Sequence, residues 1–348
     1  MRSGTFKESY PALLVLADAP WVWIWSALLI LALVAMPFAV NAYVLSLQTL
    51  VLITLIGALG LNLLTGLTGL ISLGHAGFLV LGAYAYAVLV AKHQFSPLVG
   101  FAAAGVIPAL ASIVVGLPSL RLRGLYLAIT TLAFSFIINN LILEARPITD
   151  GARGIPVLGP ELLGLDLASD QAFALLCLLV AILTLLGCLN IRRSRVGRAF
   201  MAIRDNDTAA RTMGINLWRY KLYAFMTSAC ITGLSGALMG IYLSFVSVEG
   251  FPFLLSIEAL AILIVGGLGS VLGVVLGTLL IVLLPEIVRL LFGQLGSGFE
   301  ALLSTGVHEV KSMLYGIIII LFLRFEPRGL VGIWHDAKRL WVHWPLRY

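Results

Sequence analysis

The stretch from Ala19 to Ala91 reads APWVWIWSALLILALVAMPFAVNAYVLSLQTLVLITLIGALGLNLLTGLTGLISLGHAGFLVLGAYAYAVLVA. It contains no Asp, Glu, Lys or Arg, and the charged residues that flank it are Asp18 and Lys92. A membrane-spanning helix needs about 20 apolar residues, so this stretch is long enough for three crossings. Because backbone N–H and C=O groups find no water in lipid, each crossing has to be a helix.

The rest of the chain has the same character. Of its 348 residues, 61% are hydrophobic and 11% are charged, whereas soluble domains carry about 25% charged residues. The mean hydropathy is +1.07. We therefore predict an all-α, polytopic integral membrane helical bundle that forms a single domain over residues 1–348. The net charge of +6 is attributed to basic cytoplasmic loops rather than to nucleic-acid binding.

Long apolar segments predict about ten transmembrane helices. Their ranges are 22–40, 44–64, 70–91, 97–118, 124–142, 172–190, 222–246, 255–270, 271–292 and 308–323. The eighth segment is short, and only glycines separate it from the ninth, so a full crossing there is left open. The first segment is too long for a signal-peptide core and lacks a nearby A-x-A cleavage pattern, which predicts an uncleaved first crossing.

Lys and Arg are unevenly distributed between the loops. Residues 191–221 hold eight of the 22 basic residues, which predicts that this loop is cytoplasmic. Alternation of the ten helices then sorts 17 basic residues to the inside and four to the outside. Both termini are therefore predicted to be cytoplasmic.

Two loops are long enough to have structure of their own. The outer loop 143–171 is rich in Gly, Pro and acidic residues. The second half of the inner loop 191–221 is predicted to be helical, because Asp205 or Asn206 can cap its start and Gly214 stands where a helix-ending glycine belongs. A short helix in a cytoplasmic loop of a transporter usually docks on a partner. The alternative is a solvated basic loop that only sets orientation.

Motifs for hydrolysis, redox chemistry or nucleotide binding are missing. There is no G-x-x-x-x-G-K-[ST] loop, and the glycine run 265–273 lacks the G-x-G-x-x-G spacing. No histidine pair has metal-ligand spacing, and the three cysteines lie in apolar segments without a C-x-x-C pattern. The sequence therefore predicts no catalytic site, no cofactor and no metal in this chain.

Glycine-rich segments suggest where helices approach one another or line a substrate path. The G-x-x-x-G pairs that include Gly236 and Gly273 indicate close helix packing. In residues 66–78, glycines and hydroxyls interrupt an apolar span around a histidine, which is typical of a transport path. The candidate path residues in this segment are Ser72, Gly74 and His75. The alternative for His75 is a hydrogen bond to a neighbouring helix.

A second candidate region lies at the eighth segment, around Glu258. One interpretation places Ser256 at the helix cap and Glu258 in the first turn, where an acid is favourable. The other makes Glu258 a carboxylate that faces the substrate path. Gly266 and Gly267, at the break before the ninth segment, complete the candidate path.

Several stretches resemble the permeases of branched-chain amino-acid ABC importers, and specifically the larger of their two paired subunits. They are Gly66–Tyr86 (GLTGLISLGHAGFLVLGAYAY), Arg121–Ile137 (RLRGLYLAITTLAFSFI), Ser194–Gly240, Ser256–Gly277 (SIEALAILIVGGLGSVLGVVLG) and the terminal EPRGLVGIW from Glu326. As a set, in this order, they cover most of the chain and are specific to that family.

The resemblance implies a multi-pass protein of the bacterial inner membrane that works by alternating access. Its expected partners are a second, different permease subunit, two cytoplasmic ATP-binding subunits and a periplasmic or lipid-anchored substrate-binding protein, with membrane lipid around it. The inner loop would dock on the ATPases; importer permeases show E-A-A-x-x-x-G there, and this chain has Thr208 in place of the Glu. The implied docking residues are Arg204, Asp207, Ala209, Ala210, Arg211, Met213 and Gly214.

Two alternatives stay open. A permease for urea or another small amide would share these motifs. An ion-coupled secondary transporter would belong to another class and should carry several intramembrane charges, of which the sequence offers mainly Glu258.

Overall fold

The structure is a computed structural model, and it describes residues 20–119, 122, 124–157, 161–162, 165–166, 169–293, 307–326 and 328–343. All structural statements below concern these residues.

The apolar segments predicted from the sequence are helical. In chain order they are α2 (Pro20–Ala39), α3 (Ala42–Leu61) continued by the π-helix η1 (Asn62–Leu67), α4 (His75–Ala87) continued by the π-helix η2 (Val88–Lys92), α5 (Pro97–Ser119), α6 (Leu125–Glu144), α8 (Asp170–Arg193), α11 (Leu217–Tyr242), α12 (Leu254–Gly266), α13 (Val271–Gly293) and α15 (Val307–Phe325). Seven helices in the described part are long and apolar enough to span a membrane, and residues 24–39 and 271–287 form shorter apolar helices. The all-α class is thus confirmed, while the number of crossings and the side of each terminus stay predictions.

Extended structure in the described part is limited to two-residue strands outside the long helices. β1 (Ile155–Pro156) pairs antiparallel with β4 (Phe245–Val246), and β2 (Glu161–Leu162) pairs with β3 (Leu165–Asp166). The short helices α7 (Arg146–Thr149), η3 (Gly151–Arg153) and η4 (Val248–Gly250) complete this part of the fold. The predicted outer loop is therefore tied to the end of α11.

The centre of the bundle consists of the spans that contain α3, α4 and α11, in each of which 67% of the apolar window is buried, against 33% for α5, α6 and α8. Glycines allow the central helices to touch. A Cβ atom on Gly236 would lie 2.0 Å from the Leu79 carbonyl oxygen, and one on Gly82 would lie 2.1 Å from that of Gly233. Because no side chain fits there, the packing interpretation of the glycine pairs is confirmed for Gly236.

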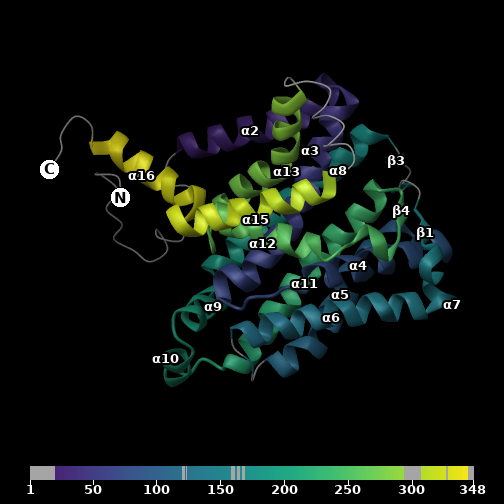
Figure 1. The fold of residues 1–348 in the computed structure, drawn as a ribbon, viewed down its shortest axis with the longest axis horizontal. Helices are drawn as coiled ribbons and strands as arrows, with labels where there is room; N and C mark the ends of the chain where they lie inside the picture. Colours follow the sequence, from purple (N-terminus) through teal and green to yellow (C-terminus); the bar gives the residue numbers. More distant parts are fainter. Residues whose placement is uncertain are drawn as a thin grey trace.

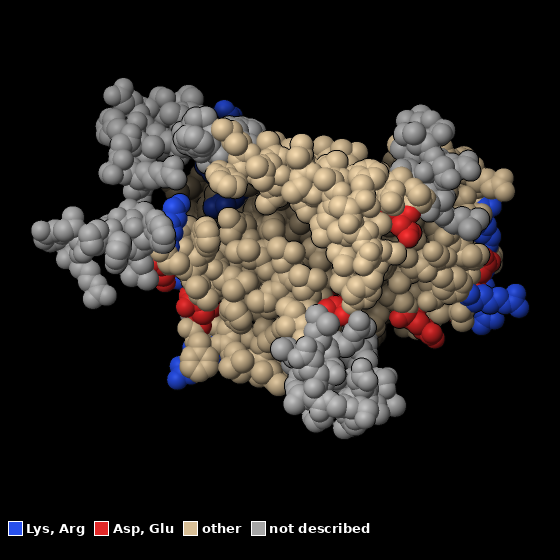
Figure 2. All heavy atoms as spheres, turned by 90° about the horizontal axis from the view of Figure 1, so that it is seen from above, with Lys and Arg blue, Asp and Glu red and all other residues tan. Residues whose placement is uncertain are grey.

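The molecule has two distinct ends along its long axis. Figure 1 shows α9 (Arg195–Asp205), α10 (Asp207–Thr212) and α16 (Gly329–His343) at one end, and α7, β1 and β4 at the other. Lys and Arg side chains gather at these two ends, while uncharged residues cover most of the surface between them (Figure 2). This distribution is the one expected for helices that cross a bilayer.

Several predicted boundaries were wrong. The third span begins at His75, because residues 69–74 are not helical. α12 ends at Gly266 instead of residue 270, and the apolar span that contains it, Val248–Gly266, begins before residue 255. The inner loop is helical in its first half as well, as α9, and α11 already begins at Leu217. The helix α16 was not predicted.

Candidate functional site

The break before α4 is stabilised by hydroxyl groups from other helices. The first N–H groups of a helix have no partner within it, and in an apolar interior they need side-chain acceptors. Here the acceptors come from α6 and α12 as well as from the break itself. The bonds are Leu73 N to Thr131 Oγ1 (2.9 Å), Gly74 N to Ser72 Oγ (3.2 Å), Ala76 N to Ser256 Oγ (2.9 Å) and Gly77 N to Ser135 Oγ (3.1 Å).

These bonds change the roles assigned to two serines. Ser72 accepts a hydrogen bond from its own segment and is buried. Ser256 does not cap its own helix, whose N-cap is Phe253; instead it serves the start of α4. The interpretation in which Ser256 caps its own helix was wrong, because its hydroxyl accepts from Ala76 N, which is 180 residues away in the chain.

His75 is buried at a contact between helices. A Cβ atom on Gly57 of α3 would lie 3.2 Å from His75 Nε2 and 3.0 Å from Ser235 Oγ of α11. Ser235 in turn donates to the Ile53 carbonyl oxygen at 2.7 Å. The imidazole therefore lies at a packing contact where α3 and α11 approach α4, and its place on a substrate path stays a prediction. Gly74 also serves packing, since a Cβ atom there would lie 2.9 Å from the Thr131 carbonyl oxygen.

Glu258 is a buried carboxylate of α12. Its carboxylate lies close to the hydroxyl group of Tyr315 of α15, and the Tyr315 side chain is itself fully buried. Residues two positions apart on a helix point about 200° apart, so Ser256 faces α4 while Glu258 faces α15. Glu258 is thus placed between helices, with a polar partner, inside the apolar bundle.

Four segments far apart in the sequence meet at what we call the inner junction, made of residues 62–69, Arg204, residues 266–270 and residues 328–329. The Asn62 side-chain oxygen accepts from Gly269 N at 3.0 Å, and Arg204 Nη1 donates to the Gly66 carbonyl oxygen at 3.0 Å. A Cβ atom on Gly329 would lie 2.6 Å from Gly267 N. The turn between α12 and α13 is therefore enclosed by backbone from both sides.

The predicted path residues Gly266 and Gly267 belong to this junction. A Cβ atom on Gly266 would lie 2.1 Å from the Gly273 carbonyl oxygen, and Gly267 has φ +112° and lies against the Arg328 carbonyl oxygen. At both positions a neighbouring carbonyl oxygen leaves no room for a side chain, so only glycine fits. The structure thus brings Gly266 and Gly267 together with Arg204 in the inner junction. Ser72 and His75 belong to the start of α4 instead.

The inner loop has the local structure that its capping residues predict. Asn206 caps α10 by accepting from Thr208 N at 2.9 Å and Ala209 N at 3.1 Å. Gly214 follows the helix with φ +83° and open space around it. Asp207 forms an ion pair of 2.9 Å with Lys221 of α11, whose side chain is 5% exposed. This ion pair connects the short helix directly to a long membrane helix.

The predicted docking residues point in different directions. Ala209 and Arg211 are exposed, and Met213 is 83% exposed. Ala210, in contrast, is 2% exposed within the chain itself, and Arg204 points to Gly66. Beside α10 lies an open pocket of about 540 Å³ lined by Asp207, Arg211, Gly214, Ile215, Asn216, Leu217, Trp218 and Lys221.

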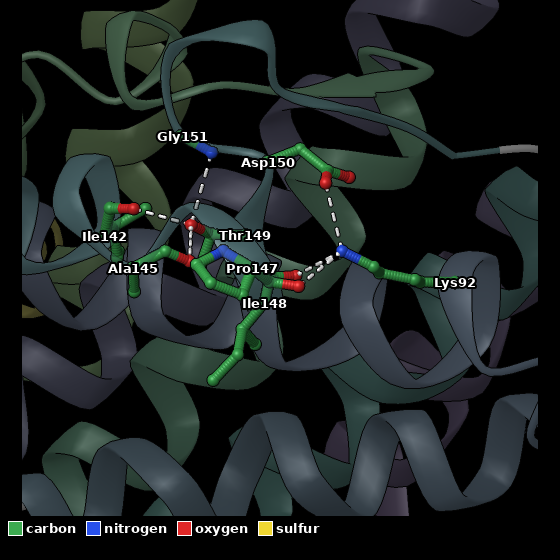
Figure 3. A network of polar contacts seen from close by, with 8 residues as sticks. All are labelled: Lys92, Ile142, Ala145, Pro147, Ile148, Thr149, Asp150 and Gly151. Atoms are coloured by element: carbon green, nitrogen blue, oxygen red, sulfur yellow. Dashed lines mark hydrogen bonds and ion pairs between the residues drawn. The ribbon is translucent and has the colours of Figure 1, made fainter.

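At the other end of the molecule, Lys92 organises an outer cluster of Lys92 and residues 147–151 (Figure 3). Its ammonium donates to the carbonyl oxygens of Pro147 and Ile148 at 2.9 and 3.2 Å, and to Asp150 Oδ1 at 3.0 Å. Thr149 donates to backbone oxygens of α6 and the residue after it and accepts from Gly151 N at 3.3 Å. The cluster ties the start of the outer loop to the end of η2.

The sequence interpretation missed Asn62, Thr131 and Ser135 as site residues. Each is a polar side chain in a predominantly apolar helix, and polar residues inside membrane helices are candidates for function or interhelical bonding. That signal was present, but it does not say which backbone group each side chain contacts.

The fold and this site define a multi-pass membrane protein of the transport-permease class, in which a helical loop at one end of the molecule reaches interrupted apolar helices. Residues 43–323 match the family model described as "Branched-chain amino acid transport system / permease component". The chain therefore belongs to this family of permease components.

Curated relatives agree with the family match. The chain is 34% identical, over 90% of its length and 76% of the relative's, to the high-affinity branched-chain amino acid transport system permease protein LivM of Escherichia coli K12. It is 24% identical to the permease protein BraD of Pseudomonas aeruginosa, over 79% of this chain and 90% of that one. No solved structure matches the chain.

Proposed function

We propose that this chain is the membrane-spanning permease subunit of an ATP-driven ABC importer that carries branched-chain amino acids across the bacterial inner membrane. The observation that carries the proposal is the family match over residues 43–323. It is supported by the inner junction, because that junction connects the helical loop to two interruptions in the apolar helices. Such interruptions are typical of the segments that form substrate sites in transporters.

Transport would proceed by alternating access. A binding protein delivers the substrate at the end that contains the outer cluster, and the ATPase subunits act at the end that contains α10. A hydrophobic amino acid needs a mostly apolar path with a few polar groups for its charged ends. Glu258 and Tyr315 are buried polar groups of this kind, and we favour them over His75, which lies at a contact between helices.

Docking of the ATPase subunits is assigned to the exposed face of α10. Ala209, Arg211 and Met213 present side chains to the outside, and a flexible methionine adapts well to a partner's groove. Ala210 is buried on the opposite side of α10, where it packs against the rest of the chain. The ion pair between Asp207 and Lys221 then transmits a displacement of α10 to α11.

The test is uptake by the assembled complex in proteoliposomes. The chain is co-purified with the second permease and the two ATPase subunits, ATP is enclosed, and the binding protein is added outside. We expect accumulation of labelled leucine that requires internal ATP and is inhibited by isoleucine and valine. Uptake of urea instead of leucine would support the small-amide alternative, and uptake abolished by ionophores without need for ATP would support the ion-coupled alternative.

A further inference from the structure

The geometry points to Arg204 as the residue that transmits movement of the cytoplasmic loop to the two helix interruptions. This inference rests on the proposed function, and it assigns to Arg204 a positioning role in place of the docking role that the resemblance implied.

The position of Arg204 at the end of α9 is the first argument. α9 ends at Asp205, and Asn206 caps α10 directly afterwards. Arg204 therefore stands at the joint between the helix that packs on the bundle and the helix that carries the exposed docking face. The inner face of α9 is anchored by the buried residues Ala199, Phe200 and Ile203, so a displacement of α10 acts first on this joint.

The contacts of Arg204 are the second argument. Its Nη1 donates to the Gly66 carbonyl oxygen at 3.0 Å. A Cβ atom on Gly69 would lie 2.9 Å from Arg204 Cγ, and one on Gly269 would lie 2.8 Å from Arg204 Nη1. One side chain thus touches the backbone of both interruptions, the one that follows η1 and the one between α12 and α13.

The third argument is that the two interruptions also hold each other. Asn62 accepts from Gly269 N at 3.0 Å, and a Cβ atom on Gly66 would lie 2.6 Å from the same nitrogen. Any separation of η1 from the α12–α13 turn breaks the Asn62 bond and changes the surroundings of Arg204. Conversely, withdrawal of Arg204 removes the side chain that lies across both segments.

Arg204 is suited chemically to such a role. Guanidinium is always charged and has five N–H donors in a planar fork, so it can bond a carbonyl oxygen while its aliphatic stem packs on glycine. Its side chain is 41% exposed, and Nε lies 3.6 Å from Asp205 Oδ1. The residue is therefore accessible enough for Arg204→Ala to leave the fold intact.

The experiment uses the complete complex in proteoliposomes with binding protein, leucine and ATP. Arg204→Ala is compared with Arg195→Ala, which removes the same charge from an exposed position of the same helix. We expect Arg204→Ala to retain its ATPase subunits and its ATP hydrolysis but to lose about tenfold in the number of leucines carried per ATP, because a bond to a charged donor is lost. The loss should fall on the maximal rate and leave the half-saturating concentration of binding protein unchanged.

Two further variants sharpen the result. Arg204→Lys keeps a charged donor and should recover part of the coupling. Asn62→Ala removes the other link between the interruptions and should lower the same leucine-to-ATP ratio while Arg204 is intact.

Coupling equal to wild type in Arg204→Ala would overturn the inference, and so would loss of the ATPase subunits from that variant, because Arg204 would then be a docking residue. In either case leucine transport by the wild-type complex would leave the proposed function standing. Failure of the wild-type complex to transport leucine would instead count against the proposed function.

Discussion

The inner junction and the outer cluster both join segments far apart in the chain, but they use different atoms. In the inner junction, backbone meets backbone across glycines, and a Cβ atom on Gly66 would lie 2.6 Å from Gly269 N. In the outer cluster, one flexible side chain, Lys92, reaches two carbonyl oxygens and a carboxylate (Figure 3).

This difference has a physical consequence. A contact between backbones leaves no room for adjustment, because interiors are close-packed and any added atom forces a shift. A lysine ion pair with side chains 30% and 44% exposed can rearrange and is screened by salt. We conclude that the inner junction is rigid, whereas the contacts that Lys92 makes in the outer cluster can rearrange.

The largest effect is expected at the ion pair that anchors α10. Lys221→Met removes a buried cation that pairs with Asp207 and should lower the free energy of unfolding by about 3 kcal/mol, because breaking a buried ion pair from one side is strongly destabilising. Unfolding by titration with SDS in mixed micelles measures this.

The matched control is the double variant Lys221→Met with Asp207→Leu. Replacing both charges by apolar side chains should restore most of the stability. A double variant as unstable as Lys221→Met alone would show that the ion pair is not the reason.

An intermediate effect is expected for Gly66→Ala in the inner junction. The added methyl group has to displace Asn62 and Gly269, and such overpacking costs about 1–3 kcal/mol. The control is Gly187→Ala in α8, where no atom lies within 4 Å of the added carbon; it should be neutral or slightly stabilising, since alanine favours helices. Equal stability of the two variants, measured by the same titration, would contradict the rigid inner junction.

The smallest effect is expected for Lys92→Ala in the outer cluster. An exposed ion pair contributes about 0–1 kcal/mol, and the difference from wild type should shrink further as salt is raised. A loss of stability as large as that of Gly66→Ala would remove the contrast between the two ends.

Much of the helical arrangement could be predicted because lipid imposes it. Long apolar segments have no alternative to helix in a bilayer, and the predicted ranges agree with the helices α2, α5 and α6 within a few residues. The capping of α10 by Asn206 was also predictable, since a cap depends on residues next to each other in the chain.

The start of α4 could not be predicted in this way. Residues 70–74 are as apolar as a helix requires, yet the chain is not helical there. Hydroxyl groups of Thr131 and Ser256 take the backbone donors that a continuing helix would have used. Such bonds are visible only when the neighbouring helices are in place.

The orientations of Ala210 and Arg204 likewise depend on tertiary contacts. Both lie in a stretch that sequence resemblance assigns to docking, but Ala210 is buried in the chain and Arg204 contacts Gly66. Ala210 lies on α10, which has six residues, and over so few residues the hydrophobic periodicity cannot tell the inner face from the outer one.

By itself, the sequence determined that this chain is a helical membrane protein of the branched-chain permease family, because composition decides which solvent surrounds a chain and motif order identifies relatives. The tertiary structure alone decided which polar groups meet. Asn62, Gly66, Arg204, Gly269 and Gly329 are spread over most of the chain, and each carries ordinary local signals. They form one junction because hydrogen bonds and backbone contacts depend on distance in space, which spacing along the chain does not reveal.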